Sequence, residues 1–280
     1  MNQHTNMQLS PTDFDIIAQI AYRESGLQLV KEKSSMIQSR LRHRVNALGL
    51  PGFETYTKHV ASESGKSELR HMISALTTNV SHFFREQHHF DILKDRVIPQ
   101  LKSKIENGEK IRIWSAGCSN GQEGYSIAMC LMENIANLKS FDVKILGTDI
   151  DPKVVEFASQ GLYPQRLLEG VPKEFLHKYF QSSATKTDDT FSVIPELTKI
   201  VAFKELNLLA KWPMKMKFDV IFCRNVVIYF DLETQNSLWP RFHSSLKEDG
   251  IMFLGHSERI NNHEKLGFYT DGPTTYRPGH

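Results

Sequence analysis

Apolar side chains recur at helical spacing through the first 85 residues of the chain, with polar positions between them. Ser10, Pro11 and Asp13 form a helix start, because they supply a candidate N-cap, a proline in the first turn and an acid near the helix N-terminus. Gly26 is the expected end of this helix. The pattern predicts a small all-helical domain. Its helices are expected near 11–25, 34–47, 53–62 and 67–78.

From about Ile111 the pattern changes to short apolar runs that alternate with helical stretches. Strands separated by helices are typical of a mostly parallel α/β sheet. Residues 175–203 interrupt the alternation with a polar loop between two β-rich pieces, which predicts a small inserted β-subdomain. Asp271-Gly272 predicts a closing antiparallel hairpin. The expected strands cover 111–117, 142–151, 199–206, 218–225 and 250–257, and the expected helices 121–136, 152–160 and 231–247.

Length and composition favour a two-domain globular protein, since the chain has 280 residues, of which 40% are hydrophobic and 24% charged. It contains no run of about 18 apolar residues that would predict a transmembrane helix. Its first residues lack the layout of a secretory signal, and three scattered cysteines do not form a disulfide framework. We therefore expect a cytoplasmic protein that does not insert into a membrane.

A turn with two glycines, Gly117 and Gly121, follows the first expected strand. Glycines let the backbone approach a ligand closely, and the N-terminus of the next helix offers unpaired N–H groups. Asp149, at the end of the second strand, is placed to accept hydrogen bonds from ribose hydroxyls, while Asp151 fits the cap of the following helix. The residues favour a nucleoside ligand, although a tight βα turn is an alternative and NAD is not separated from S-adenosylmethionine.

Six motifs resemble, in order and at similar spacing, those of the chemotaxis receptor methyltransferases, the CheR family of protein-glutamate O-methyltransferases. They are TTNVSHFFRE (77–86), IWSAGCSNGQEGYS (113–126), GTDID (147–151), FKELNLL (203–209), FCRNVVIYFD (222–231) and FLGHSE (253–258). The resemblance spans nearly the whole chain. It implies a Rossmann-like S-adenosylmethionine-dependent methyltransferase domain at 89–280, preceded by a helical substrate-docking domain and linker at 1–88.

The resemblance also implies a division of labour in the cofactor site. Glu123 would accept hydrogen bonds from the α-ammonium group of S-adenosyl-L-methionine, and Arg85 with the Gly117 region would face its carboxylate. Asp149 would hold the ribose. The product would be S-adenosyl-L-homocysteine. The other cofactor contacts carried over from the family are Asn79, Ser81, Asn207, Leu208, Asn225 and Val226.

The chain departs from the family pattern in two places. The family usually has G-E-E-P-Y-S where this chain has GQEGYS at 121–126. The second acid, Glu123, is kept, so cofactor binding is expected, while the missing proline is expected to loosen the helix start. Ser81 stands where threonine is common and keeps the hydroxyl group.

The implied reaction needs no general base, because a glutamate with a pKa of about 4.3 is ionised at pH 7. Catalysis is then expected from alignment of carboxylate oxygen, methyl carbon and sulfur. Arg85 would also steer the incoming carboxylate and Tyr229 would fix it by a hydrogen bond; a buried aromatic role is the alternative for Tyr229. His88, His89 and His256 are expected to be structural, and no metal is expected, because the chain has no zinc-ligand spacing.

The implied substrate is the cytoplasmic helical domain of a methyl-accepting chemotaxis receptor. Residues 31–44 carry five cations and one acid, with Arg40 and Arg44 at i, i+4 on one side of a helix. This face is predicted to dock receptor helices, with a solvated helix face as the alternative. Residues 181–187 lack the glycine-rich turn of family members that bind a receptor C-terminal peptide, so no such tether is expected. The protein is expected to be a monomer.

Three other functions fit the residues less well. A regulatory or scaffold protein that binds S-adenosylmethionine without transferring its methyl group would not need to keep the implied site residues together. A nucleic-acid methyltransferase would call for a D/N-P-P-Y/F motif where RNVV stands at 224–227, and for a broad basic surface, whereas the net charge is only +2. A dehydrogenase would call for the G-x-G-x-x-G turn that the chain lacks.

Overall fold

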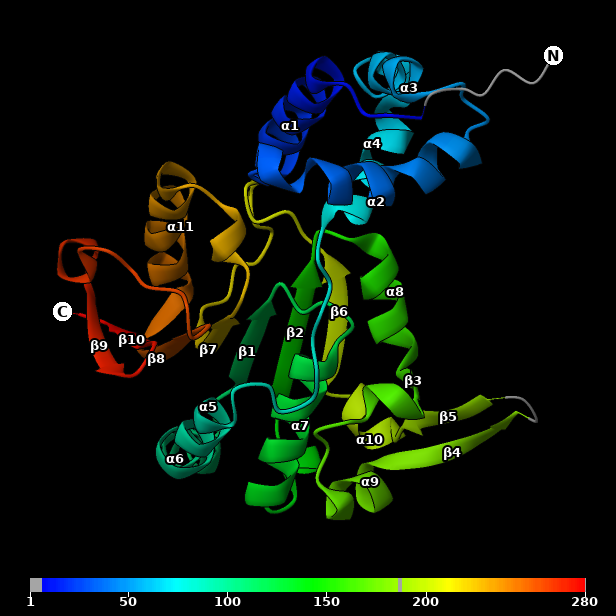
Figure 1. The fold of residues 1–280 in the computed structure, drawn as a ribbon. Helices are drawn as coiled ribbons and strands as arrows, with labels where there is room; N and C mark the ends of the chain where they lie inside the picture. The colour runs from blue at the N-terminus through cyan, green and yellow to red at the C-terminus, as the bar shows by residue number, and fades with distance from the viewer. Residues whose placement is uncertain (1–6, 186–187, 280) are drawn as a thin grey trace. The chain divides into compact units, whose positions relative to one another are not determined.

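The computed structural model describes residues 7–185 and 188–279, which divide into two compact units (Figure 1). One, which we call the helical unit, comprises the residues up to Thr78 together with Tyr229–Thr234. The other, the α/β unit, comprises Asn79–Ile228 together with the residues from Gln235 onward. Among the residues described, no helix combines the length and apolar character needed to cross a lipid bilayer.

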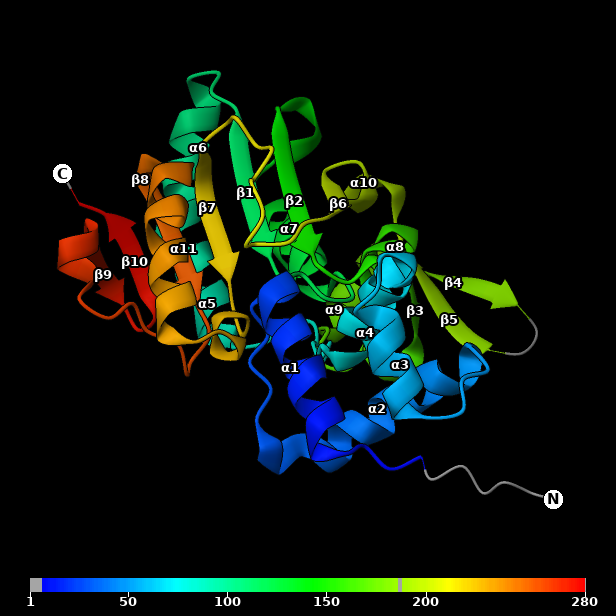
Figure 2. The same ribbon diagram turned by 90° about the horizontal axis from the view of Figure 1, so that it is seen from above.

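The helical unit confirms the helices that the periodicity predicts (Figure 2). At its start, the Ser10 hydroxyl accepts a hydrogen bond from the Asp13 N–H at 3.1 Å, and Gly26 ends the first helix with a φ of 72°. The core between the helices includes Ile17, Leu41, Tyr56 and Met72, all with no exposed surface. The α-helices are α1 (Pro11–Ser25), α2 (Ser34–Ala47), α3 (Phe53–Val60) and α4 (Lys66–Leu76), and the short 3-10 helices are Lys31–Lys33 and Glu63–Gly65.

A seven-stranded sheet in the order β6-β2-β1-β7-β8-β10-β9 forms the centre of the α/β unit. The first five of these strands run parallel, and β10 is antiparallel to both of its neighbours. This confirms the predicted Rossmann-like sheet and its closing hairpin. The strands are β1 (Ile111–Ala116), β2 (Val143–Asp149), β6 (Val201–Glu205), β7 (Phe218–Cys223), β8 (Leu246–Leu254), β9 (Phe268–Gly272) and β10 (Thr275–Pro278).

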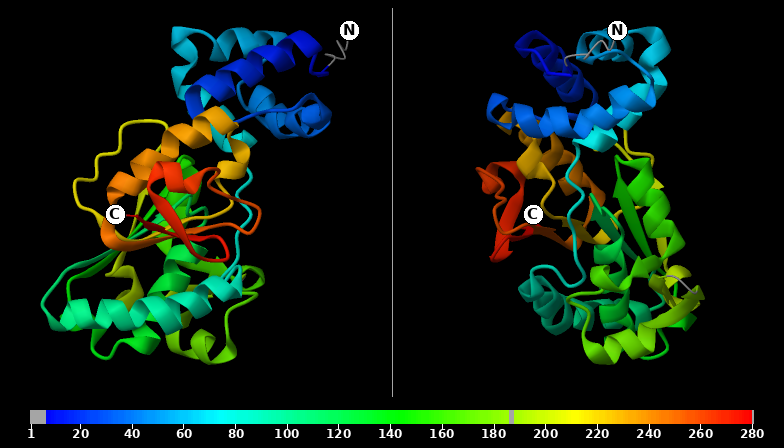
Figure 3. Two further views of the ribbon diagram at one scale, coloured as in Figure 1. Left: turned by 90° about the vertical axis from the view of Figure 1, so that its left-hand side faces the viewer. Right: turned by 45° about the vertical axis from the view of Figure 1, so that its right-hand side comes forward.

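Helices cover both faces of this sheet, with α6 and α7 on one side and α11 on the other (Figure 3). On the α11 side, Trp114 of β1 packs against Phe242 at 5.4 Å and Trp212 at 4.8 Å between ring centroids. Residues 206–217 form no helix or strand, so the loop carrying Trp212 covers the sheet here. The helices are α5 (Gln87–Ile92), α6 (Ile98–Glu106), α7 (Gln122–Asn134), α8 (Pro152–Gln160), α9 (Lys173–Tyr179), α10 (Pro195–Thr198) and α11 (Leu232–Ser245), with a π-helical turn at Leu93–Val97 and 3-10 helices at Leu138–Ser140, Gln165–Leu167, Val227–Tyr229 and His263–Leu266.

A second, three-stranded antiparallel sheet confirms the small β-structure expected beside the main sheet, in the order β3-β5-β4. β4 (Phe180–Thr185) and β5 (Asp188–Val193) fall in the predicted insertion. The predicted range is wrong at both ends, because β3 (Leu162–Pro164) precedes it and residues 201–203 belong to β6. Of the loop expected to lack a receptor tether, residues 186–187 lie outside the described part of the chain.

Candidate active site

The segment Asn79–Glu86, which we call the strap, is bound to the turn that follows β1. The carbonyl oxygen of Asn79 accepts a hydrogen bond from the Ser119 hydroxyl at 3.0 Å. The carbonyl oxygen of Ser81 accepts one from the side-chain amide of Gln122 at 3.2 Å. Two residues predicted from the first motif, Asn79 and Ser81, are therefore held beside the glycine turn.

Asp149 and Asp151 stand at the carboxyl end of β2 with different partners. Asp151 caps α8, because its side chain accepts a hydrogen bond from the Lys153 N–H at 3.0 Å, and it also accepts the Asn79 amide at 2.8 Å. The Asp149 carboxylate accepts the Ser119 N–H at 2.8 Å and the Asp151 N–H at 3.0 Å. Burial raises the pKa of Asp149. The predicted cap is confirmed, and the ribose contact of Asp149 stays a prediction.

Both glycines of the turn adopt left-handed backbone conformations, with φ of 80° at Gly117 and 83° at Gly121. A Cβ atom at Gly117 would lie 2.2 Å from Cγ2 of Val226, and one at Gly121 would lie 2.6 Å from Cβ of Ala158. Side chains of this chain therefore fill the space that each glycine leaves. The packing at Gly117 brings it into direct contact with Val226, another predicted cofactor residue.

Arg224, directly after β7, lies at the centre of a buried charged cluster. Its guanidinium group pairs with Glu123 at 3.0 Å and with Glu86 at 3.2 Å, and it also donates a hydrogen bond to the Arg85 carbonyl oxygen. The exposed fractions of the three charged side chains are only 2% for Arg224, 12% for Glu123 and 11% for Glu86. The other oxygen of Glu123 accepts the Ser115 hydroxyl at 2.6 Å.

The charges in this cluster do not balance among themselves. Burial raises the pKa of Glu123, and Arg224 opposes that rise. Burial would also raise the pKa of Glu86, but Arg224 and hydrogen bonds from His256 outweigh it and lower the pKa to about 2. With both carboxylates ionised, one guanidinium leaves a net charge of −1. A second cation near Glu123, such as an α-ammonium group, would complete the pairing.

The turn after β6 carries the predicted residues Asn207 and Leu208. The Asn207 side-chain oxygen accepts the Leu209 N–H at 2.9 Å, and the Leu208 carbonyl oxygen accepts the Trp212 indole N–H at 3.0 Å. Just before them, the Leu206 N–H donates to the carbonyl oxygen of Asp149 at 2.8 Å. This turn is thus bonded to the end of β2.

The turn after β7 carries the predicted residues Asn225 and Val226. Asn225 has a φ of 60°, and its side-chain amide lies 3.4 Å from Glu86 of the strap. The N–H groups of Asn225 and Val226 both donate to the carboxylate of Glu258 at 2.8 Å. The structure therefore gathers the predicted cofactor residues of the α/β unit at the turns after β1, β2, β6 and β7, with the strap beside them.

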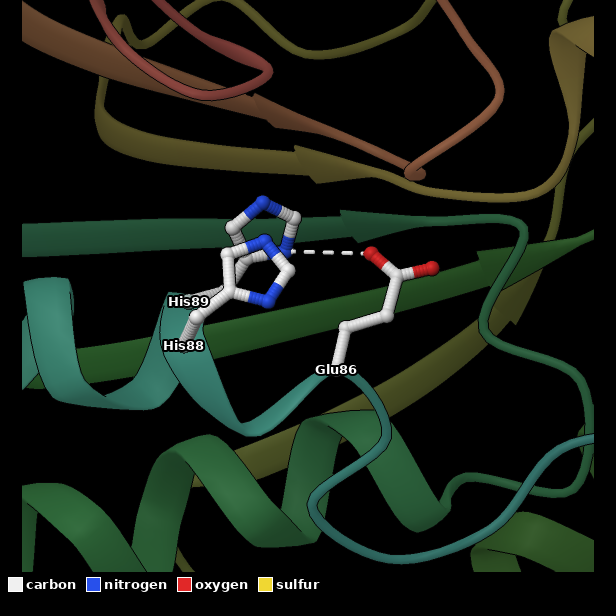
Figure 4. A group of neighbouring side chains, drawn as sticks. All are labelled: Glu86, His88 and His89. Atoms are coloured by element: carbon white, nitrogen blue, oxygen red, sulfur yellow. Dashed lines mark ion pairs between the residues drawn. The ribbon is translucent and has the colours of Figure 1, made fainter.

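Glu86, His88 and His89 form a group in which potential ligand atoms lie within 4.8 Å of one another (Figure 4). Nδ1 of His89 is 3.4 Å from Glu86. Burial and the charge of Arg224 lower the pKa of His89 to about 3, so its ring is uncharged at neutral pH. Arg224 already supplies a cation to the same carboxylate, which disfavours a divalent metal there. The absence of a metal stays a prediction.

Tyr229, predicted to fix the methyl acceptor, belongs to the helical unit. It is half-buried at the end of the 3-10 helix Val227–Tyr229, and its carbonyl oxygen accepts the Gln28 N–H at 3.0 Å. Its contact with the methyl acceptor stays a prediction, as does the role of Arg85, whose side chain donates to the Val80 carbonyl oxygen at 3.0 Å.

The two arginines predicted to dock the substrate have partners inside the helical unit. Arg40 donates to the Leu76 carbonyl oxygen at 2.7 Å, at the end of α4. Arg44 pairs with Glu68 at 2.5 Å, and the Tyr56 hydroxyl also donates to Glu68 at 3.0 Å. Their docking role stays a prediction, but both side chains also hold α2 against α4.

Three charged residues of the site were not predicted: Arg224, Glu86 and Glu258. Each lies within a motif quoted above, at its end or directly after its strand. The signal that could have found Arg224 is its position, because an arginine that directly follows the apolar strand FDVIFC needs an anionic partner when buried. Its partners, however, lie 101 and 138 residues away in the sequence.

Comparison with known proteins identifies both parts of the chain. Residues 12–77 match the family model of the CheR methyltransferase all-alpha domain, and residues 79–275 match that of the CheR methyltransferase SAM-binding domain. A probable chemotaxis protein methyltransferase of Rhizobium etli is 44% identical over 91% of this chain and 96% of its own length. Chemotaxis protein methyltransferases of Borreliella burgdorferi and Escherichia coli are 40% and 38% identical, over 97% and 96% of this chain and 96% and 91% of their own lengths.

Proposed function

The chain belongs to the CheR methyltransferase family, and we propose that it forms methyl esters on the side-chain carboxylates of glutamates in chemotaxis receptors. It is an S-adenosylmethionine-dependent methyltransferase of chemotaxis receptors, as its domain match and its relatives indicate. The proposal adds the acceptor group and the residues that act on it.

One observation carries the assignment of the site: hydrogen bonds join all six sequence motifs into a single network. The strap bonds to the glycine turn and to the turn after β2. The glycine turn bonds to Asp149, whose carbonyl oxygen accepts the Leu206 N–H of the turn after β6. Arg224 bonds to the helix after the glycine turn, and Glu258 bonds to the residues that follow Arg224. Residues far apart in the sequence are thus held together, which supports a shared cofactor site.

The residues present fit S-adenosylmethionine. When bound, it supplies an electrophilic methyl group on a sulfonium centre and leaves as S-adenosylhomocysteine. Glu123 would hold its α-ammonium group, because the cluster with Arg224 and Glu86 lacks one cation. Asp149 would hold the ribose with its remaining acceptor positions. Contacts with the rest of the cofactor would come from Asn79, Ser81, Arg85, Gly117, Asn207, Leu208, Asn225 and Val226.

The chain's own contribution to transfer is alignment rather than proton removal. A receptor glutamate is already ionised near neutral pH, so no base is required. Arg85 would attract the carboxylate and Tyr229 would orient it by a hydrogen bond. The anionic pair Glu86–Glu123 is neutralised in part by Arg224, which limits repulsion of an incoming carboxylate.

We place receptor docking on α2 of the helical unit, with Arg40 and Arg44 among its cations. Lys31, Lys33 and Arg42 are exposed along the same segment and offer charge to an acidic helix. The substrate is the cytoplasmic helical domain of the receptor, and the protein acts there as a monomer. Arg42→Glu should slow receptor methylation and leave the dissociation constant for S-adenosylhomocysteine unchanged; unaltered receptor kinetics would exclude this face.

The proposed reaction is tested by incubating the protein with methyl-labelled S-adenosylmethionine and receptor cytoplasmic fragments, followed by mild base. Label that base releases as methanol, and that maps to glutamate-containing peptides, is the expected result. Receptor fragments with the labelled glutamates replaced by alanine serve as the control. Base-stable label would refute ester formation, and binding of the cofactor without any label on receptor would favour a scaffold instead.

A further inference from the structure

Glu258, at the turn after β8, has an unusual set of partners for a buried acid. Only 2% of its surface is exposed. One carboxylate oxygen accepts the N–H groups of Gly255 at 2.6 Å and Asn225 at 2.8 Å. The other accepts the N–H groups of Val226 at 2.8 Å and Ile228 at 3.3 Å. Four backbone amides, from the turns after β7 and β8, therefore converge on one side chain.

These bonds keep the carboxylate in place and give the loop 225–228 its shape. Burial raises the pKa of Glu258, and the backbone N–H groups oppose that rise. Hydrogen bonds to an ionised acceptor are about twice as strong as neutral ones. In return, Glu258 accepts hydrogen bonds from three N–H groups of the loop that lie outside the β-strands and need an acceptor.

The loop needs such support because its first residue is strained. Asn225 has a φ of 60°, a left-handed conformation that L-residues adopt infrequently. Asn tolerates this region better than most residues. The carboxylate that accepts the Asn225 N–H in this conformation comes from Glu258, 33 positions later in the sequence.

The loop in this shape forms one wall of the proposed cofactor site. Val226 packs so closely on Gly117 that a Cβ atom there would lie 2.2 Å from Cγ2 of Val226. Asn225 reaches toward Glu86 of the strap at 3.4 Å. The separation between the glycine turn and the loop is thus set by where Glu258 holds the loop's backbone.

We propose that Glu258 is a positioning residue for the cofactor: it touches no part of S-adenosylmethionine, but fixes the loop 225–228 against the Gly117 turn. The inference rests on the proposed function, because it assigns that loop to the cofactor. It predicts that removing the charge of Glu258 weakens cofactor binding much more than it slows turnover at saturating cofactor.

The test is Glu258→Gln in the full chain, measured by calorimetry with S-adenosylhomocysteine. The amide keeps one acceptor oxygen and turns an N–H group toward N–H donors, so the dissociation constant should rise at least tenfold. The turnover number at saturating S-adenosylmethionine should stay within threefold. Hydrogen exchange of the amides of 225–228 should speed up, because they lose their acceptor.

Asp219→Asn is the matched control, since Asp219 is equally buried at the opposite end of β7 and bonds Lys104, Lys247 and the Arg112 N–H. It should lower stability and leave the dissociation constant within twofold of the parent value. An equal loss of affinity in both variants would reduce Glu258 to a structural role. Unchanged affinity in Glu258→Gln would also overturn the proposal.

Two further results separate a positioning role of Glu258 from a folding defect and from a failure of the proposed substrate. If Glu258→Gln does not fold, Glu258→Asp keeps the charge but draws it back by one methylene, and should weaken binding at least threefold. Failure of both to fold while the control folds would assign Glu258 to stability alone. Parent protein that binds S-adenosylhomocysteine but esterifies no receptor would refute the proposed substrate and not the role of Glu258, whereas parent protein that does not bind it refutes both.

Discussion

Replacing Arg224 with methionine removes the cation from the Glu123–Glu86 cluster while keeping most of the side-chain volume. Breaking a buried ion pair from one side costs about 3–5 kcal/mol, because a charge is left without a partner. The variant can avoid part of that cost by protonating Glu123, whose ordinary pKa is 4.5. Protonation costs about 1.4 kcal/mol for each pH unit above that value.

Protonation of Glu123 gives the loss of stability in the variant a defined pH dependence. At pH 7.5 the protonated form lies about 4 kcal/mol above the ionised unfolded state, so the loss in free energy of unfolding should approach that figure. At pH 5.5 the same term falls to about 1.4 kcal/mol. The sign follows from a folded-state pKa that has been raised, since the proton is then bound more tightly in the folded protein than in the unfolded one.

Urea unfolding followed by tryptophan fluorescence reports on the α/β unit, which contains the Arg224 cluster. The three tryptophans, Trp114, Trp212 and Trp239, all belong to the α/β unit. The double variant Arg224→Met with Glu123→Gln needs no proton, and it should recover most of the loss at pH 7.5 and little at pH 5.5. A loss that is the same at both pH values, or that the second substitution does not reduce, would show that the cluster is not a coupled charged unit.

Three shorter predictions concern other parts of the chain. Asp149→Asn should weaken S-adenosylhomocysteine binding roughly 10- to 100-fold in calorimetry, the worth of a hydrogen bond to a charged acceptor; unchanged binding would remove Asp149 from the ribose. His89 has a folded-state pKa of about 3, below its ordinary 6.5, so it stabilises the protein above pH 6.5 and less as the pH falls. His89→Gln should reduce the slope of unfolding free energy between pH 6 and 4 by up to about 1.4 kcal/mol per pH unit, and an unchanged slope would contradict this. Arg44→Ala should destabilise the helical unit by about 3 kcal/mol in hydrogen exchange, because the buried Glu68 loses its cation. Arg42 is exposed, so Arg42→Ala should change the stability by less than about 0.5 kcal/mol. Equal effects of the two substitutions would refute a stabilising role for the Arg44–Glu68 pair.

The sequence predicted the elements of this fold because their signals are local. The start of α1 follows from Ser10-Pro11, and the end of the helix from Gly26, within one turn of the residues that they cap. The parallel strands follow from short apolar runs between helices. By contrast, β3 has only three residues, too few for any periodicity, so the small sheet was placed too late in the chain.

The residues around the site were predicted less completely, for a related reason. The family motifs named the positions predicted to contact the cofactor, and the structure gathers those of the α/β unit at neighbouring turns. The partners that hold them were not visible, because Arg224 meets Glu123 and Glu86 only after the strand order of the sheet is known. The same holds for Arg44. Its place on a helix face predicts an exposed side chain, but in the structure it pairs with Glu68 of α4.

The departures from the family motif gain a physical meaning from the same contacts. Gln122 stands where the family usually has an acid, and its amide donates to the Ser81 carbonyl oxygen at 3.2 Å. An ionised carboxylate has no proton to donate there, and Gln122 is fully buried. With Gly124 in place of the usual proline, α7 still begins at Gln122. The loosening expected from the lost proline is therefore opposed by the hydrogen bond that Gln122 donates to the strap, which ties the start of α7 to the segment that carries Arg85.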